Sequence, residues 1–207
     1  MFNTIIFDLD YTLYNESNYI NKCFNSSNLF KNNVKLRYEL RINSRNFIKD
    51  TLKKKKCYSK KNSNIIFNNL KKQKMKIFLY SGFLSLFKIL KEKKIKIGLL
   101  TNGNPLIQKN KIKNLKIEKY FDSIIFARKF DIQKPNKKAF YKILKILKSE
   151  PKKSLFIGDH IENDIEGAKS IGMRTLWVNH KKVKNINSDF MVYDPNFTSK
   201  KILQLIR

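Results

Sequence analysis

The chain has 207 residues, with 45 Lys and Arg against 16 Asp and Glu, and its formal net charge is +29. Hydrophobic residues make up 42% of it and aromatic residues 13%, which excludes a chain that is disordered over most of its length. The apolar runs are shorter than the ~18 residues of a membrane-spanning helix, and the start lacks the basic region of a signal peptide. We therefore expect one globular domain, or one domain with a small insertion, and no membrane partner.

The high positive charge raises the question of nucleic-acid binding. The charge comes from 39 Lys and only 6 Arg, and the chain also has 24 Asn and 26 Ile. Lys, Asn and Ile all have A/T-rich codons, so we attribute most of the charge to coding bias, whereas contacts to phosphates and bases favour Arg. We expect no nucleic-acid partner, and a basic nucleic-acid-binding protein on the same scaffold stays an alternative.

In chain order, the first expected element is a buried strand at residues 4–8, with the sequence Thr-Ile-Ile-Phe-Asp. Residues 15–79 follow with short helical patterns between polar joints. This segment has 17 Lys and Arg against 3 Asp and Glu, a net charge of +14, while the other 142 residues together carry +15. We expect a small, strongly basic α-helical cap at 15–79 and an α/β core formed by 1–14 and 80–207.

From residue 81 onward, short apolar runs alternate with helical periodicity. The patterns predict helices at 83–90 and 140–147, strands at 95–100, 124–126, 154–157 and 175–178, and a last strand and helix within 189–206. Strands and helices that alternate at this spacing favour right-handed crossovers between parallel strands. The sequence therefore predicts an α/β fold, a doubly wound, Rossmann-like parallel sheet with helices on both faces.

The two cysteines, Cys23 and Cys57, match no metal-ligand spacing and form no disulfide framework. Such usage is typical of a reducing compartment. We therefore expect a cytoplasmic location.

Polar residues gather where the predicted strands end, which is the edge at which doubly wound sheets bind ligands. Each residue alone is as typical of a helix cap or a turn, but their joint position at one edge favours a site. The candidate site residues, in chain order, are Asp8, Asp10, Thr101, Asn102, Gly103, Lys134, Asp159 and Asp164.

Four carboxylates at one sheet edge cannot all stay ionised without a cation, because like charges raise each other's pKa. We expect Mg²⁺ as the cofactor, since this hard ion binds a few carboxylates together with water and substrate phosphate. Beside it, Asp8 is placed to attack phosphorus as a nucleophile. Asp10 is placed to protonate the leaving oxygen and later to take a proton from the hydrolytic water.

The remaining candidates suit the phosphate group. Thr101, Asn102 and the main-chain N–H of Gly103 can donate hydrogen bonds to phosphate oxygens. Lys134 can offset the negative charge that spreads over these oxygens in the transition state. Together with the carboxylates, these residues predict a site of phosphoryl transfer.

These motifs resemble those of the haloacid dehalogenase superfamily of aspartate-nucleophile phosphohydrolases. The resemblance runs from DLDYT at 8–12 through TNG at 101–103 and KP at 134–135 to GDHIENDIEGAKSIGM at 158–173. It implies a helical cap after the first strand, with Asp8 as nucleophile and Asp10 as acid/base.

For the rest of the site, the resemblance implies that Thr101 and Asn102 bind phosphate and that Lys134 balances charge. It implies that Asp159 ligates the metal and that Asp164 is a ligand or a close partner that orients the site. By the same resemblance, Asp10 ligates Mg²⁺ through its main-chain carbonyl.

The second carboxylate, Asp10, argues against the dehalogenase and phosphonate-cleaving members of the superfamily, which lack it. The residues Thr-Leu-Tyr that follow are similar to the monophosphatase branch. We expect a Mg²⁺-dependent phosphomonoester hydrolase that forms an aspartyl-phosphate and acts on a small phosphorylated metabolite, either a sugar phosphate or a nucleoside monophosphate. A phosphomutase of the same superfamily stays open as an alternative.

Four further residues near these motifs have simpler expected roles. Tyr11 stands where the superfamily often has Gly, Asp or Asn, and we expect its side chain to point outward. We expect His160 at the pocket rim or facing solvent, and His180 in a surface loop. Trp177, between Leu176 and Val178, is expected in the sheet.

Overall fold

The computed structural model describes residues 2–29, 47–72, 74–184 and 187–206. These residues form one six-stranded sheet with the strand order β3-β2-β1-β4-β5-β6, and every neighbouring pair is parallel. The strands are β1 (Thr4–Phe7), β2 (Lys96–Thr101), β3 (Ser123–Phe126), β4 (Ser154–Gly158), β5 (Arg174–Val178) and β6 (Phe190–Val192).

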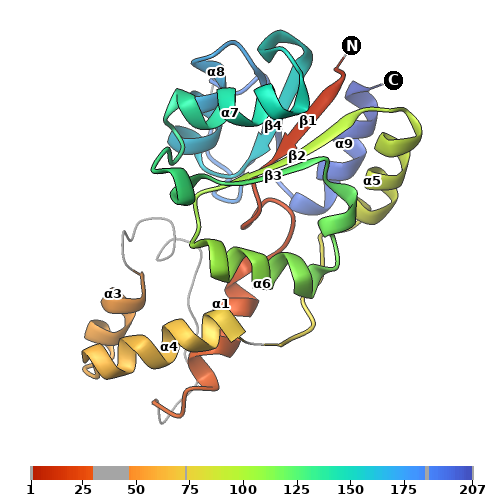
Figure 1. Cartoon of the computed structure of the whole chain (residues 1–207). Coiled ribbons are helices and arrows are strands. Elements are labelled where there is room, and N and C mark those ends of the chain that lie inside the picture. Colours follow the sequence, from red (N-terminus) through yellow and green to blue (C-terminus); the bar gives the residue numbers. More distant parts are fainter. Residues whose placement is uncertain (1, 30–46, 73, 185–186, 207) are drawn as a thin grey trace.

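Helices connect these strands and cover both faces of the sheet (Figure 1). The longer ones are α1 (Glu16–Asn25), α3 (Phe47–Lys54), α4 (Lys60–Lys72), α5 (Phe83–Glu92), α6 (Pro105–Leu115), α7 (Lys137–Leu147) and α9 (Thr198–Leu205). The short ones are η1 (Glu118–Tyr120), η2 (Ala127–Phe130), η3 (Pro151–Lys153), η4 (Ile161–Glu166), α8 (Gly167–Lys169) and η5 (Pro195–Phe197). The predicted doubly wound α/β fold is confirmed.

The alternation of side chains along β1 builds the core on both sides of the sheet. Ile6 joins a buried cluster with Phe140 and Ile143 of α7 on one face. Phe7 faces the other side, where its ring meets those of Phe83 and Phe87 of α5 at centroid distances of 5.9 and 5.7 Å. Because β1 is buried on both faces and paired on both edges, it holds the loop that follows it in a fixed position.

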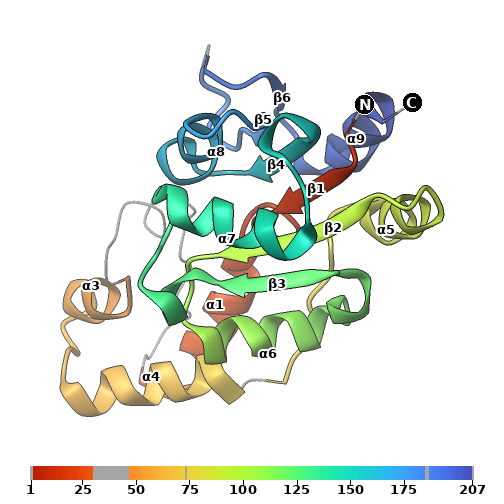
Figure 2. The same cartoon turned by 45° about the horizontal axis from the view of Figure 1, so that its top comes forward.

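Within the described residues of the segment 15–79 lie the helices α1, α3 and α4, which we call the insertion helices. Figures 1 and 2 place them together, beside α6 and beyond the ends of the central strands. α4 packs against α1, α3 and α6, and Asn69 Nδ2 of α4 donates a hydrogen bond of 3.1 Å to the carbonyl oxygen of Cys23. The insertion helices therefore contact the core through α6.

The observed bounds agree with the predicted elements to within a few residues. The main difference is α6, which the periodicity of the sequence did not indicate. None of the described helices has the length and apolar character needed to cross a bilayer.

Candidate active site

Three carboxylates meet at the carboxyl edge of the sheet. Oxygens of Asp8, Asp159 and Asp164 lie within 4.8 Å of one another, and all three residues are buried. Asp8 directly follows β1 and is anchored by its main-chain N–H, which donates to the carbonyl of Ile157 at 2.8 Å. Gly158 permits the approach of Asp164, since a Cβ on this glycine would lie 2.4 Å from the Asp164 side chain. The predicted meeting of these carboxylates is found in the structure.

The predicted lysine reaches the same cluster. Lys134 Nζ lies 2.7 Å from Asp8 Oδ1 and 2.6 Å from Asp164 Oδ1, and 2% of the Lys134 side chain is exposed. Burial alone would lower the pKa of Lys134, but the carboxylates of Asp164 and Asp8 raise it above its usual value. Lys134 is therefore charged and links the loop after β1 to η4.

Burial and the charge of Lys134 have opposite effects on the pKa of Asp8. Burial, together with the neighbouring carboxylates of Asp164 and Asp10, raises the pKa of Asp8 to about 7, although Lys134 acts to lower it. A bound cation would favour the ionised form again. Three close carboxylates that offer only oxygen donors fit a hard divalent ion such as Mg²⁺.

Neighbouring residues hold Asp159 and Asp164 in place. Trp177 Nε1 of β5 donates a hydrogen bond of 2.9 Å to the main-chain oxygen of Asp159. The main-chain N–H of His160 donates to Asp164 Oδ2 at 3.0 Å, and His160 Nδ1 accepts from the N–H of Asn163 at the start of η4. Trp177 is thus a buried sheet residue as predicted, and the side chain of His160 caps a helix.

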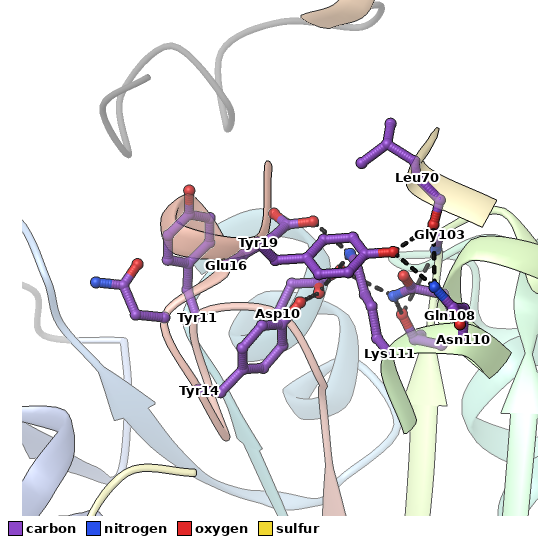
Figure 3. A network of polar contacts seen from close by, with 12 residues as sticks. Asp10, Tyr11, Tyr14, Glu16, Tyr19, Leu70, Gly103, Gln108, Asn110 and Lys111 are labelled. Carbon is purple, nitrogen blue, oxygen red and sulfur yellow. Dashed lines mark hydrogen bonds and ion pairs between the residues drawn. The ribbon is translucent and has the colours of Figure 1, made fainter. Parts of the chain in front are cut away.

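Asp10 differs from the expectation that four carboxylates lie side by side. Its carboxylate is not part of the cluster of Asp8, Asp159 and Asp164. Instead, Asp10 Oδ1 accepts from Tyr14 Oη at 2.7 Å and from Lys111 Nζ at 2.8 Å (Figure 3). The physical reason is that a buried cation, which the sequence did not single out, attracts this carboxylate toward α6.

The side chain of Gln108 on α6 packs against the loop formed by residues 101–103. Gln108 Nε2 donates to Thr101 Oγ1 at 2.7 Å and to Asp10 Oδ2 at 2.8 Å. The main-chain N–H of Gly103, predicted to bind phosphate, is directed at Thr101 Oγ1 at 3.5 Å. A Cβ on Gly103 would lie 2.4 Å from Gln108 Cδ, so glycine allows this close contact.

The side chain of Asn102 connects two loops of the site. Its amide exchanges two hydrogen bonds of 2.8 Å with the main chain of Lys134. The Lys134-Pro135 peptide bond is cis. Asn102 therefore joins the loop after β2 to the segment that supplies the buried lysine.

One expectation about the aromatic residues near the site is wrong. Tyr11 does not point outward: 4% of it is exposed, and its hydroxyl lies 2.9 Å from Ser17 Oγ of α1. His180 lies in the loop after β5 as expected but is half-buried, with its Nε2 2.6 Å from the Tyr11 carbonyl oxygen and its ring against those of Tyr11 and Tyr80. Burial lowers the pKa of His180. These contacts depend on loops that are distant in sequence.

A cavity of about 600 Å³ lies between the insertion helices and the loop after β2. Its core side includes Asn102, Gly103 and Lys111, which places it next to the candidate phosphate site. The helix side mixes apolar, aromatic and cationic side chains. Examples are Phe47, Ile48, Lys49, Tyr58, Lys60 and Phe67. A cavity of this size with such a mixed lining is typical of a small-molecule site.

The fold and this edge define an α/β enzyme with an acidic site at the carboxyl ends of its strands. The family model of haloacid dehalogenase-like hydrolases matches residues 5–178, and the chain belongs to this family.

Several curated relatives are named as phosphatases. The glyceraldehyde 3-phosphate phosphatase of Methanocaldococcus jannaschii is 27% identical over an alignment of 208 positions. This alignment covers 91% of this chain and 90% of that protein. The enzyme of the same name from Pyrococcus abyssi is 37% identical over 93 residues, 45% of this chain and 39% of its own length. Mouse N-acylneuraminate-9-phosphatase is 30% identical over 114 residues, 55% of this chain and 45% of its own length. The chain thus matches about two fifths of the length of the Pyrococcus relatives.

Solved structures share the fold. The magnesium-bound HAD-hydrolase YfnB of Bacillus subtilis superimposes with a TM-score of 0.74 at 18% identity, over 100% of this chain and 99% of that one. The β-phosphoglucomutase of Clostridium difficile gives a TM-score of 0.68 at 22% identity, over 100% of each of the two chains.

Proposed function

We propose that this protein is a Mg²⁺-dependent phosphomonoester hydrolase that works through an aspartyl-phosphate on Asp8. The observation that carries the proposal is the buried position of Asp8 at the end of β1, hydrogen-bonded to Lys134 and close to Asp159 and Asp164. The names of the phosphatase relatives support the same reaction class.

In the first step, an Asp8 carboxylate oxygen forms a bond to phosphorus while the bond from phosphorus to the leaving oxygen breaks. Asp10 gives a proton to this oxygen. In the second step, Asp10 takes a proton from water, whose oxygen attacks phosphorus, and the Asp8 carboxylate and inorganic phosphate are released. Lys134 stabilises the charge of the transferred group throughout.

The metal would be held by Asp8, Asp159 and Asp164, together with the main-chain carbonyl of Asp10. When bound, Mg²⁺ supplies positive charge that neutralises the phosphate oxygens and the crowded carboxylates. Thr101, Asn102 and the main chain of Gly103 would bind phosphate oxygens, once substrate displaces the contact of Gly103 with Thr101.

We infer that residues 15–79 act as a cap over the core formed by 1–14 and 80–207, and that the cavity beside Asn102 accepts the substrate's organic group. A sugar phosphate or a nucleoside monophosphate is a suitable substrate, since curated relatives include sugar-phosphate phosphatases and a pyrimidine 5'-nucleotidase of Escherichia coli. The free thiols of Cys23 and Cys57 support a cytoplasmic location.

The test is release of phosphate from p-nitrophenyl phosphate by the purified chain with and without Mg²⁺. Wild type should be active only with the metal, and Asp8→Asn should be inactive. Equal rates for wild type and Asp8→Asn would reject the proposal. Beryllofluoride, which mimics the acyl phosphate, should inhibit wild type.

The phosphomutase alternative is supported by the structural likeness to the β-phosphoglucomutase of Clostridium difficile, which extends over the whole chain. With a sugar phosphate as substrate, a hydrolase releases inorganic phosphate, whereas a mutase moves it to another carbon of the sugar. Phosphorus NMR of the reaction mixture separates the two outcomes.

A nucleic-acid-binding role would require affinity for duplex or single strands that falls steeply with salt.

A further inference from the structure

Lys111 is a buried cation between two carboxylates. Two per cent of its side chain is exposed, and Nζ lies 2.8 Å from Asp10 Oδ1 of the core and 2.5 Å from Glu16 Oε1 of α1 (Figure 3). Glu16 is equally buried. Burying a charged lysine costs free energy of folding, and here the two carboxylates offset that cost.

The neighbours of Lys111 engage both oxygens of Asp10. Gln108, one helical turn earlier on α6, donates to Asp10 Oδ2, while Lys111 and Tyr14 donate to Oδ1. All three groups donate, so Asp10 is held as a hydrogen-bond acceptor. This is the form in which a carboxylate takes a proton from water.

Helix α6 also contacts the insertion helices through Asn110. Asn110 Nδ2 donates to Tyr19 Oη of α1 at 3.0 Å, and the Tyr19 hydroxyl donates to the main-chain oxygen of Leu70 in α4. These contacts are drawn in Figure 3. α6 thus contacts the insertion helices through Asn110 and Lys111, and it contacts Asp10 through Gln108 and Lys111.

We propose that Lys111 is a positioning residue that holds Asp10 as the base of the second step, and that Glu16 ties this position to helix α1. The proposal rests on the proposed function. The hydrogen bond from Lys111 orients the carboxylate of Asp10. The ion pair with Glu16 of α1 holds the ammonium group of Lys111 in place. Hydrolysis of the aspartyl-phosphate is the step that depends on this arrangement.

The two steps of the reaction separate this role from a merely structural one. p-Nitrophenolate is a good leaving group and needs little help from an acid, so phosphorylation of Asp8 proceeds without a well-placed Asp10. Release of phosphate still needs a base. A mispositioned Asp10 should therefore slow the second step and let phosphorylated Asp8 accumulate.

The experiment compares wild type with Lys111→Met in rapid-mixing and steady-state assays on p-nitrophenyl phosphate with Mg²⁺. We expect kcat to fall by about 10²-fold or more, in line with the usual contribution of a general base. We expect kcat/KM to change less than about 10-fold, and a burst of nearly one nitrophenolate per protein. Intact-protein mass spectrometry should detect the phosphorylated chain.

Two variants serve as comparisons. Lys111→Arg keeps a cation within reach of both carboxylates and should recover much of kcat without a burst. Asn110→Ala removes a contact from α6 to the insertion helices but leaves Asp10 untouched, and it should not accumulate phosphoprotein. If Lys111→Met does not fold, the double variant Lys111→Met/Glu16→Gln removes one buried carboxylate along with the cation, and the same burst is expected.

Parallel losses of kcat and kcat/KM without a burst would overturn the role of Lys111 while leaving the proposed function intact. A burst of equal size in Asn110→Ala would also overturn it, since any loosening of α6 would then be enough. A wild-type protein that neither turns over nor forms phosphorylated Asp8 would reject the proposed function and this inference together.

Discussion

The side-chain amide of Asn102 and the main chain of Lys134 exchange two hydrogen bonds, each 2.8 Å long. Asn102 Nδ2 donates to the Lys134 carbonyl, and Asn102 Oδ1 accepts from the Lys134 N–H. Because Lys134 Nζ contacts Asp8 and Asp164, this exchange places the ammonium group beside the proposed nucleophile. Asn102, which the sequence predicts to bind phosphate, therefore also positions Lys134.

Asn102→Ala should therefore destabilise the fold as well as the reaction. It leaves the N–H and the carbonyl of Lys134 without these partners, and we expect the free energy of unfolding to fall by about 1–3 kcal/mol. Urea unfolding measures this change. The exposed residue Asn68 of α4 offers a control, and Asn68→Ala should stay within about 0.5 kcal/mol of wild type. Equal effects of the two substitutions would contradict the prediction.

Lys134→Met should have a larger effect, because it leaves Asp8 and Asp164 without a buried cation. Loss of one partner of such a cluster typically costs about 3–5 kcal/mol. Mg²⁺ should restore part of this loss, since it supplies positive charge to the same carboxylates. Thermal unfolding with and without Mg²⁺ tests both points. The exposed Lys138 serves as the matched control, and Lys138→Met should unfold like wild type.

Trp177 offers a direct probe of the metal. It is the single tryptophan of the chain, and its Nε1 donates to the main-chain oxygen of Asp159. Titration with Mg²⁺ should change its fluorescence, and saturation at 100 times Kd should stabilise the fold by about 2.7 kcal/mol. Asp159→Asn should remove both effects, while Glu162→Gln, an exposed change nearby, should preserve them. An unchanged signal together with unchanged stability would argue against the metal site.

His180 should make stability depend on pH. Burial lowers the pKa of His180 below the usual value of 6.5, although the Tyr11 carbonyl and Asp194 act in the opposite direction. The folded protein then binds fewer protons than the unfolded chain, so stability is full above pH 6.5 and is lost as pH falls toward the lowered value. His180→Gln should lack this loss. The raised pKa of Asp8 affects both proteins equally, so the difference between their unfolding curves isolates His180.

The sequence was most informative where chain order and strand ends determine position. Asp8 and Asp159 directly follow buried apolar strands, and parallel strands bring their carboxyl ends to one edge. The approach of Asp8 to Asp159 could therefore be predicted from their spacing. Lys134 and Asp164 do not directly follow a strand, and the motifs that contain them singled them out. The separate orientation of the Asp10 side chain could not be predicted, because it depends on contacts with α6.

Helix α6 was missed for a physical reason. Its inward face carries Gln108 and Lys111 next to Ile112, so buried polar residues interrupt the apolar pattern that predicts an amphipathic helix. Lys111 is also one of 39 lysines, and nothing in the sequence separates a buried lysine from an exposed one. The Asn-Pro pair at 104–105 was the available signal, since Asn104 is the N-cap and Pro105 begins the helix.

The surroundings of Tyr11 and His180 were not predicted for a related reason. They come from contacts between the loop after β1, helix α1 and the loop after β5. Sequence patterns describe single elements, whereas the contact between Tyr11 and His180 joins residues that are 169 positions apart.

The central place of β1 has a consequence for biosynthesis. Thr4 pairs with Lys96 on one side and with Ser154 on the other, so β1 is synthesised before both of its partner strands. Until then, the apolar side chains of Ile5, Ile6 and Phe7 lack their sheet neighbours, and Asp8 lacks Lys134 and Asp164. The nascent chain therefore exposes an apolar segment until β4 has been synthesised, and the site assembles only after that point.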